Sequence, residues 1–125
     1  MTSEDQSEII SFLSTAEAFS DGSKSVVRKE THISEIFIGE KRTFKLKRAV
    51  KLPYLDFSTI DLRHRYCLAE VSINKRTAPG IYIGVKPVTR EHDGSLAIGG
   101  SGNIIDWLVE MNSFDEEMIF NNLVG

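Results

Sequence analysis

The sequence predicts an α+β fold in which one helix packs against a mostly antiparallel, five-stranded sheet. Two observations predict it. Segments with alternating apolar and polar residues lie on both sides of one long helical segment, and short turns join several of them. The chain has 125 residues, a formal net charge of −3 and 41% hydrophobic residues, which suits one small domain.

The elements are expected in a simple order along the chain. Residues 6–19 carry apolar side chains at helical spacing, and Gly22 breaks that pattern. Three strand segments follow, at residues 26–31, 34–38 and 43–50. Residues 58–77 are predicted as a helix with Ser58 as its N-cap. The segments 81–90, 95–98 and 104–111 are expected to give two or three further strands, and a final helix is expected within 115–123.

Composition excludes several classes of protein. No apolar stretch approaches the ~20 residues of a membrane span, so no membrane partner is expected. The single cysteine, Cys67, rules out an internal disulfide and a cysteine-based zinc cluster, and it favours a cytoplasmic location. The net charge of −3 argues against a basic nucleic-acid binder, although residues 24–65 alone carry a local +6.

Two features indicate chemistry. In the strand at 43–50, alternation places Phe44 and Leu46 on the core side and Lys45 and Lys47 together on the opposite face. Glu70 lies in the middle of the following helix, beside an apolar surface. A carboxylate in that position is costly unless it is paired, so the strand lysines are its expected partners.

A hairpin, a strand with lysine, a helix with glutamate and an antiparallel strand pair resemble the layout of a protein-kinase-like N-lobe. The amino-acid sequences of several segments resemble those of the bacterial aminoglycoside-phosphotransferase-like proteins that are often fused to a P-loop ATPase domain. The segments that carry this resemblance, over residues 9–118, are Thr31-His32-Ile33-Ser34, Phe44-Lys45-Leu46-Lys47-Arg48-Ala49-Val50, Leu55-Asp56-Phe57-Ser58-Thr59, Glu70 with Asn74-Lys75-Arg76, Ala78-Pro79, Tyr82 with Gly84-Val85, and Asp106-Trp107 with Met111.

The resemblance implies roles for particular residues in binding ATP. Lys45 or Lys47 would contact the nucleotide phosphates, and the spacing leaves open which of them does so. Glu70 would orient that lysine, and the turn that ends at Ser34 would take the place of a glycine-rich loop. Glu110 and Met111 would belong to a hinge that offers main-chain groups to the adenine edge.

The resemblance also implies a C-lobe, whose His-Gly-Asp-type catalytic loop and metal-binding aspartate have no counterpart in this sequence. The whole chain, 1–125, is therefore interpreted as one lobe. Residues 1–22 would form an N-terminal helix, 23–112 the sheet and its helix, and 113–125 the start of the missing lobe. Catalytic residues are not expected here, and Mg²⁺ is expected only together with the missing lobe.

Two functions follow as expectations. In the first, the chain is an N-lobe fragment, or the product of a truncated gene, which contacts ATP weakly at most and is inactive alone. In the second, it is a stand-alone interaction module that pairs with a separate C-lobe or with a second copy of itself, because half a kinase exposes an apolar cleft face.

Overall fold

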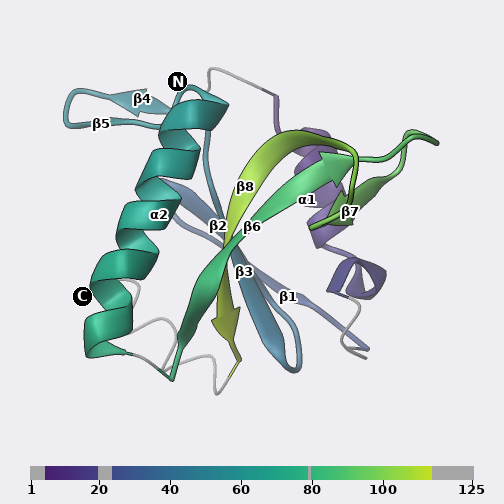
Figure 1. The fold of residues 1–125 in the computed structure, drawn as a ribbon, viewed down its shortest axis with the longest axis horizontal. Coiled ribbons are helices and arrows are strands. Elements are labelled where there is room, and N and C mark those ends of the chain that lie inside the picture. Colours follow the sequence, from purple (N-terminus) through teal and green to yellow (C-terminus); the bar gives the residue numbers. More distant parts are fainter. Residues whose placement is uncertain (1–4, 20–23, 79, 114–125) are drawn as a thin grey trace.

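The computed structural model describes residues 5–19, 24–78 and 80–113, and within them it forms a three-layer α+β fold. The middle layer is a strongly twisted six-stranded sheet with the strand order β1-β2-β3-β8-β6-β7, in which every neighbouring pair is antiparallel (Figure 1). Its strands are β1 (Val27–Glu30), β2 (Ser34–Ile38), β3 (Arg42–Lys47), β6 (Tyr82–Arg90), β7 (Leu96–Ile98) and β8 (Asn103–Asn112).

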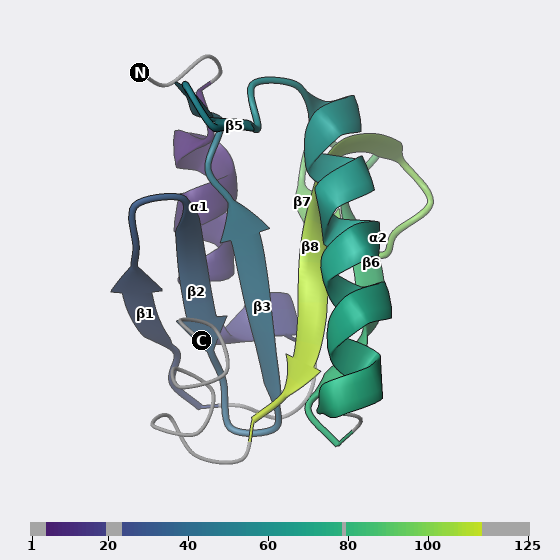
Figure 2. The same cartoon turned by 90° about the vertical axis from the view of Figure 1, so that its left-hand side faces the viewer.

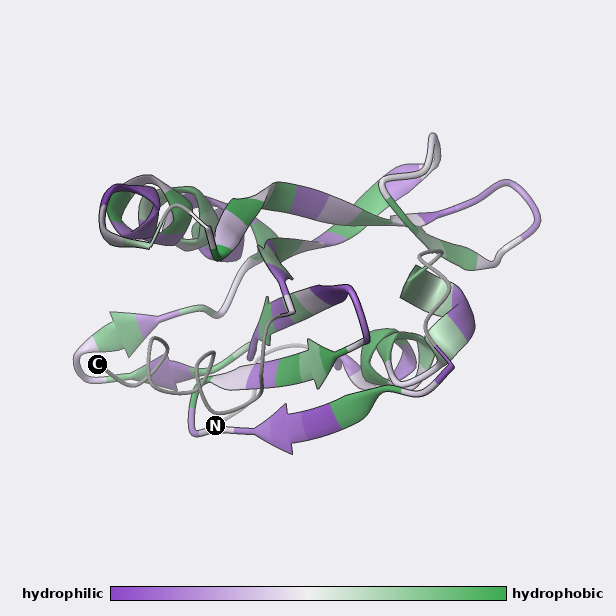
Figure 3. Cartoon of the chain, turned by 90° about the horizontal axis from the view of Figure 1, so that it is seen from below, coloured by the Kyte–Doolittle hydropathy of each residue, from purple (hydrophilic) through white to green (hydrophobic). Residues whose placement is uncertain are grey.

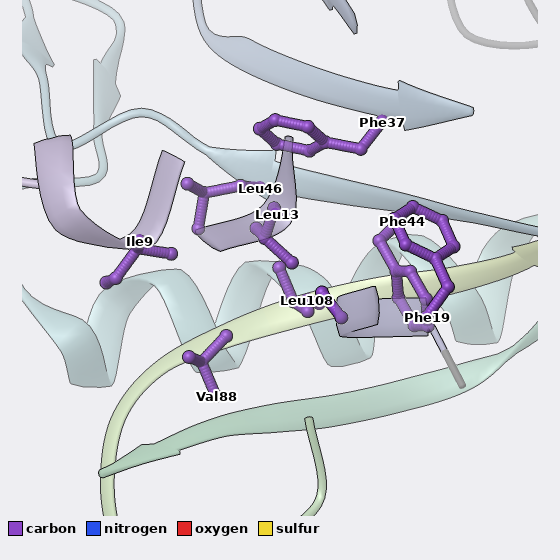
Figure 4. Close-up of a cluster of buried hydrophobic side chains, with 9 residues drawn as sticks. Ile9, Leu13, Phe19, Phe37, Phe44, Leu46, Val88 and Leu108 are labelled. Carbon is purple, nitrogen blue, oxygen red and sulfur yellow. The ribbon is translucent and has the colours of Figure 1, made fainter. Parts of the chain in front are cut away.

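One face of the sheet is covered by the N-terminal segment, which forms the helix α1 (Ser7–Leu13) and the 3₁₀ turn η1 (Ala16–Phe19). A cluster of buried side chains joins this segment to β2, β3, β6 and β8, and Figure 4 shows most of its members: Ile9, Leu13, Ala18, Phe19, Phe37, Phe44, Leu46, Val88 and Leu108. Phe19 meets Phe44 edge to face, with 5.1 Å between the ring centroids. This cluster is the larger of the two hydrophobic cores.

The opposite face is covered by α2 (Ile60–Thr77), which runs alongside β8 and β6 (Figure 2). Its core is smaller and consists of Cys67, Val71, Ile81, Tyr82, Val109 and Met111. Seen from below, α2 lies at the left of the strands and α1 at the right (Figure 3). Successive residues of β8 therefore alternate between two different cores, because successive strand residues point to opposite faces, whereas β3 contributes apolar side chains only to the core under α1.

The structure confirms the α+β class and the antiparallel sheet but corrects the strand count. The sheet has six strands where five were predicted, because 81–90, 95–98 and 104–111 all join it. The turn between β6 and β7 contains Gly94 with φ +89°, a conformation that favours glycine. A separate two-stranded ribbon of β4 (Lys51–Leu52) and β5 (Leu55–Asp56), which was not predicted, protrudes beside the start of α2 (Figure 1).

The helix predictions also need correction. The predicted N-cap Ser58 is wrong by one residue, since the Thr59 hydroxyl accepts the N–H of Leu62 at 3.2 Å. The N-terminal helix is broken after Leu13 into α1 and η1. The helix predicted within 115–123 lies outside the described residues. Among the helices that are described, none combines the length and apolarity that a membrane crossing requires.

Candidate functional site

The candidate site is built on β3, whose side chains alternate as the sequence predicted. Phe44 and Leu46 enter the core beneath α1, so Lys45 and Lys47 point to the face that α2 covers. Both lysine side chains are almost enclosed, with 10% and 6% of their surface exposed. Two buried ammonium groups on one face need an anionic partner close by.

Glu70 of α2 supplies that partner to both lysines. Its Oε2 lies 3.0 Å from Lys45 Nζ and its Oε1 lies 2.6 Å from Lys47 Nζ, so each carboxylate oxygen receives one ammonium. The hydroxyl of Tyr82 donates a longer hydrogen bond of 3.4 Å to Oε2. Lys47 Nζ also lies 5.1 Å from the centre of the Phe57 ring, within the range of a cation–π contact.

The electrostatics of this cluster are set by two ammonium groups that share one carboxylate. Burial, the largest single influence, would raise the pKa of Glu70, but the charges and hydrogen bonds of Lys45 and Lys47 together outweigh it and lower the pKa. Burial lowers the pKa of Lys45, and the charge of Lys47 adds to that effect against the attraction of Glu70. With all three groups ionised, the cluster carries one excess positive charge.

Ser34 begins β2 directly opposite Lys47 in the β2–β3 register, which places both side chains on the same face. Its main chain is fixed by the preceding turn, where Thr31 Oγ1 accepts the Ser34 N–H at 3.0 Å. Its side-chain hydroxyl is buried, and among the described residues it has no hydrogen-bond partner. A buried hydroxyl without a partner next to a cationic cluster is suited to donate to an anion.

The two predicted hinge residues, Glu110 and Met111, lie on opposite faces of the sheet, and only Met111 is on the face of Lys45 and Lys47. Both lie inside β8, flanked by β3 on one side and β6 on the other. An adenine edge could reach their main chain only by displacing one of these strands. The Glu110 side chain lies on the α1 face, 3.5 Å from Arg42, and Met111 is fully buried in the core under α2.

Sequence reasoning missed a second buried charge cluster, formed by Arg63 of α2 and Asp106 of β8. Arg63 Nε donates to Asp106 Oδ1 at 2.9 Å, and each side chain is only 1% exposed. A signal for it is present in the sequence. Residues 63, 67 and 71 share one helix face, so Arg63 is a charged residue in line with the apolar Cys67 and Val71. Across residues 5–19, 24–78 and 80–113, no group of three or more His, Cys, Asp or Glu could hold a metal ion.

Comparison with known proteins gives distant and partial relatives. No family model and no solved structure matches the chain. Uncharacterised proteins of Mycobacterium tuberculosis (Rv2004c) and Mycobacterium bovis (Mb2027c) are each 35% identical to it over 57 residues. The matched part is 46% of this chain but 11% of the length of each relative. This chain is therefore similar, over less than half of its residues, to a small part of two much longer proteins.

Proposed function

We propose that this chain is the nucleotide-contacting N-terminal lobe of an aminoglycoside-phosphotransferase-like kinase, and that Lys45, Lys47 and Ser34 contact nucleotide phosphates. The observation that carries the proposal is the Glu70 carboxylate held between two strand lysines, at 3.0 and 2.6 Å. A helix glutamate that orients a strand lysine for ATP phosphates is the central feature of a kinase N-lobe. The site is an arrangement of three elements, so chance alternation on one strand does not produce it.

The order of elements supports the same interpretation. The lysine strand β3 is followed by the glutamate helix α2 and then by the antiparallel strands β6 and β8, and β8 pairs with β3. This is the layout of hairpin, lysine strand, glutamate helix and antiparallel pair that the sequence resembles. The extra strand β7 lies at the edge of the sheet, away from β3.

The groups present fit the phosphates of a nucleotide better than its base. The excess positive charge of the lysine–glutamate cluster attracts an anion, and the buried Ser34 hydroxyl offers a donor beside it. The adenine role proposed for Glu110 and Met111 stays a prediction that the pairing of β8 on both edges makes less favourable. ATP would therefore contact this chain mainly through its phosphate groups.

The proposal is tested by NMR titration of the purified chain with ATP, with and without Mg²⁺, and with tripolyphosphate, which lacks the base. We expect weak binding, with a dissociation constant in the millimolar range, and the largest changes in NMR chemical shift at Lys45, Lys47 and Ser34. The shifts should be lost in the double variant Lys45→Met/Lys47→Met and retained in Lys86→Met. Lys86 is a matched control because it is exposed and lies on the α1 face, opposite Leu108.

Two results would overturn the proposal. Equal shifts in the wild type and in the double lysine variant would show that the cluster is not the site of contact. Robust transfer of the γ-phosphate by the 125-residue chain would contradict its assignment as a lobe that is inactive alone, because phosphoryl transfer needs an acceptor-orienting group and carboxylates that hold Mg²⁺.

An interaction module is the second candidate, and a specific surface favours it. Tyr66 and Ile73 lie two turns apart on α2 on either side of Glu70, with 39% and 65% of their surface exposed. Large apolar side chains exposed beside the candidate site are what a C-lobe or a second copy would cover. Light scattering over a concentration series tests this function, since a strict monomer that purifies without a partner contradicts it.

A further inference from the structure

The position of α2 is not explained by its apolar contacts. Its buried side chains are Arg63, Cys67 and Val71, and only the last two belong to a hydrophobic core. Leu68 and Ile73 expose 51% and 65% of their surface to solvent. Since the stability of a helix in a protein comes largely from its packed apolar face, a helix with so narrow a face needs other contacts to fix it.

Arg63 supplies such contacts at the start of α2. Its Nε donates to Asp106 Oδ1 at 2.9 Å, and its Nη1 donates to the carbonyl of Phe57 at 2.8 Å. The second carboxylate oxygen of Asp106 accepts a hydrogen bond of 2.9 Å from Gln6 Nε2. The side chains of Gln6, Asp106 and Arg63 thus form one buried polar network, in which α2, β8 and the residue before α1 meet.

The same network holds the end of β3. Gln6 Nε2 also donates to the carbonyl of Lys47 at 3.0 Å, and Gln6 Oε1 accepts the N–H of Ala49 at 2.9 Å. Gln6 is itself buried. One glutamine therefore fixes the main chain that carries a site lysine, and through Asp106 and Arg63 it fixes the helix that carries Glu70.

The spacing on α2 connects the network to the site. Arg63 and Glu70 are seven residues apart, which is about two helical turns and ~10 Å along the axis, so they lie on nearly the same side of the helix. A helix transmits a shift at one such position to the other because its own hydrogen bonds hold it rigid over two turns. A displacement of Arg63 would therefore move Glu70 relative to the lysines.

We propose that the Gln6–Asp106–Arg63 network positions Glu70 between Lys45 and Lys47 and keeps the cluster assembled in the absence of any ligand. These three residues are positioning residues, since they touch neither the lysine ammonium groups nor the Glu70 carboxylate in the contacts described. The assembled geometry is a property of the free chain. Its use in holding phosphates rests on the proposed function.

Competitive lysine acylation, read out residue by residue by mass spectrometry, tests the proposal without any nucleotide. In the wild type, Lys45 and Lys47 should react at least about tenfold more slowly than the exposed Lys75. In Asp106→Asn and in Gln6→Ala, the reactivity of Lys45 and Lys47 should rise severalfold, while that of Lys75 stays constant. Arg63→Lys should restore part of the protection that Arg63→Met removes, because an ammonium can still pair with Asp106.

Two controls separate positioning from a general loss of stability. Arg65→Gln changes an exposed cation on the same helix and should leave both lysines protected. Leu13→Ala destabilises the core on the other face of the sheet, so at matched residual stability it should raise their reactivity less than Asp106→Asn does. Unchanged reactivity in folded Gln6→Ala and Asp106→Asn, or an equal rise in Leu13→Ala, would overturn the proposal.

The ATP titration on the same variants distinguishes this proposal from the proposed function. If acylation responds as expected and ATP does not bind the wild type, the positioning network stands and phosphate contact falls. If ATP binds at the lysines and acylation does not respond to Gln6→Ala or Asp106→Asn, the site stands and the network has no positioning role. If Asp106→Asn fails to fold, Gln6→Ala still decides the outcome, because it leaves the Arg63–Asp106 ion pair in place.

Discussion

At the scale of single residues, replacing Glu70 should lower the free energy of unfolding more than replacing either lysine. Glu70→Gln leaves two buried ammonium groups without a counter-charge, whereas Lys45→Met or Lys47→Met leaves Glu70 with one lysine. We expect Glu70→Gln to lower the free energy of unfolding by about 3 kcal/mol, and each lysine variant to lower it by less. Urea unfolding measures all three variants. A smaller loss for Glu70→Gln than for either lysine variant would contradict the shared-carboxylate geometry.

The pH dependence of stability follows from the lowered pKa of Glu70. Above its ordinary pKa of 4.5 the carboxylate is ionised in both the folded and unfolded chain, and its full stabilisation is present. As the pH falls below 4.5, the unfolded chain binds this proton first, so stability is lost until the folded form is protonated too. The stability difference between the wild type and Glu70→Gln should therefore shrink below pH 4.5. A stability difference between the two proteins that stays constant from about pH 7 to about pH 3 would contradict the lowered pKa of Glu70.

Cys67 tests the packing beneath Glu70. Its thiol is fully buried under α2, and burial raises its pKa from 9.0 to about 12. In the native chain at pH 8, a disulfide reagent should therefore react with Cys67 only through opening of the structure, and in urea it should react at once. Rapid labelling of the native chain, at the rate of a free thiol, would contradict the packing of α2 on β8.

The residue pattern predicted the faces of β3 correctly but not how many partners Glu70 would have. Alternation is a local property, so Phe44 and Lys45 could be assigned to opposite faces from the sequence alone. The sharing of Glu70 by both lysines depends on how α2 packs on β8 and β6 beside β3, which is a property of several elements together. The free hydroxyl of Ser34 is likewise visible only once its neighbours are placed.

At the scale of elements, the start of α2 distinguishes two adjacent hydroxyl residues. Thr59 caps the helix by accepting the N–H of Leu62, whereas the main-chain N–H of Ser58 donates to Asp56 Oδ1. Thr59→Ala should cost about 1 kcal/mol of unfolding free energy, and Ser58→Ala should cost clearly less. Thermal or urea unfolding of the two variants provides the comparison, and a reversed order would place the N-cap at Ser58 after all.

Element types were easier to predict than element ends. Periodicity over many residues identified α2 and β6, but Ser58 and Thr59 are both good N-caps, and the choice depends on which side chain reaches an unpaired N–H. The β4–β5 ribbon escaped prediction because its strands have two residues each, too few to show alternation. It exists because Lys51 and Leu52 pair with Asp56 and Leu55 across a tight turn.

At the scale of the whole molecule, the sheet has a hydrophobic core on each face, whereas the sequence predicted only one helix packed against it. The apolar residues of α1 predicted a helix, yet nothing in their spacing said that it would cover the face opposite α2. That arrangement follows from β6 and β8, which have buried apolar side chains on both faces and leave neither face suited to solvent. Both cores therefore depend on the same central strands.

Leu13→Ala tests whether the two cores unfold as one unit. Leu13 is fully buried between α1 and the sheet. Truncating a large core side chain to alanine should therefore lower the free energy of unfolding by roughly 2–5 kcal/mol. Trp107, the single tryptophan of the chain, packs against the core on the other face and stacks on His64 with 3.6 Å between ring centroids. Because β6 and β8 belong to both cores, the Trp107 fluorescence transition should shift to lower urea together with the far-ultraviolet circular dichroism. A fluorescence midpoint that stays in place while the circular dichroism shifts would mean that the α2 face, with its lysine–glutamate cluster, folds independently of the N-terminal helix that covers the other side.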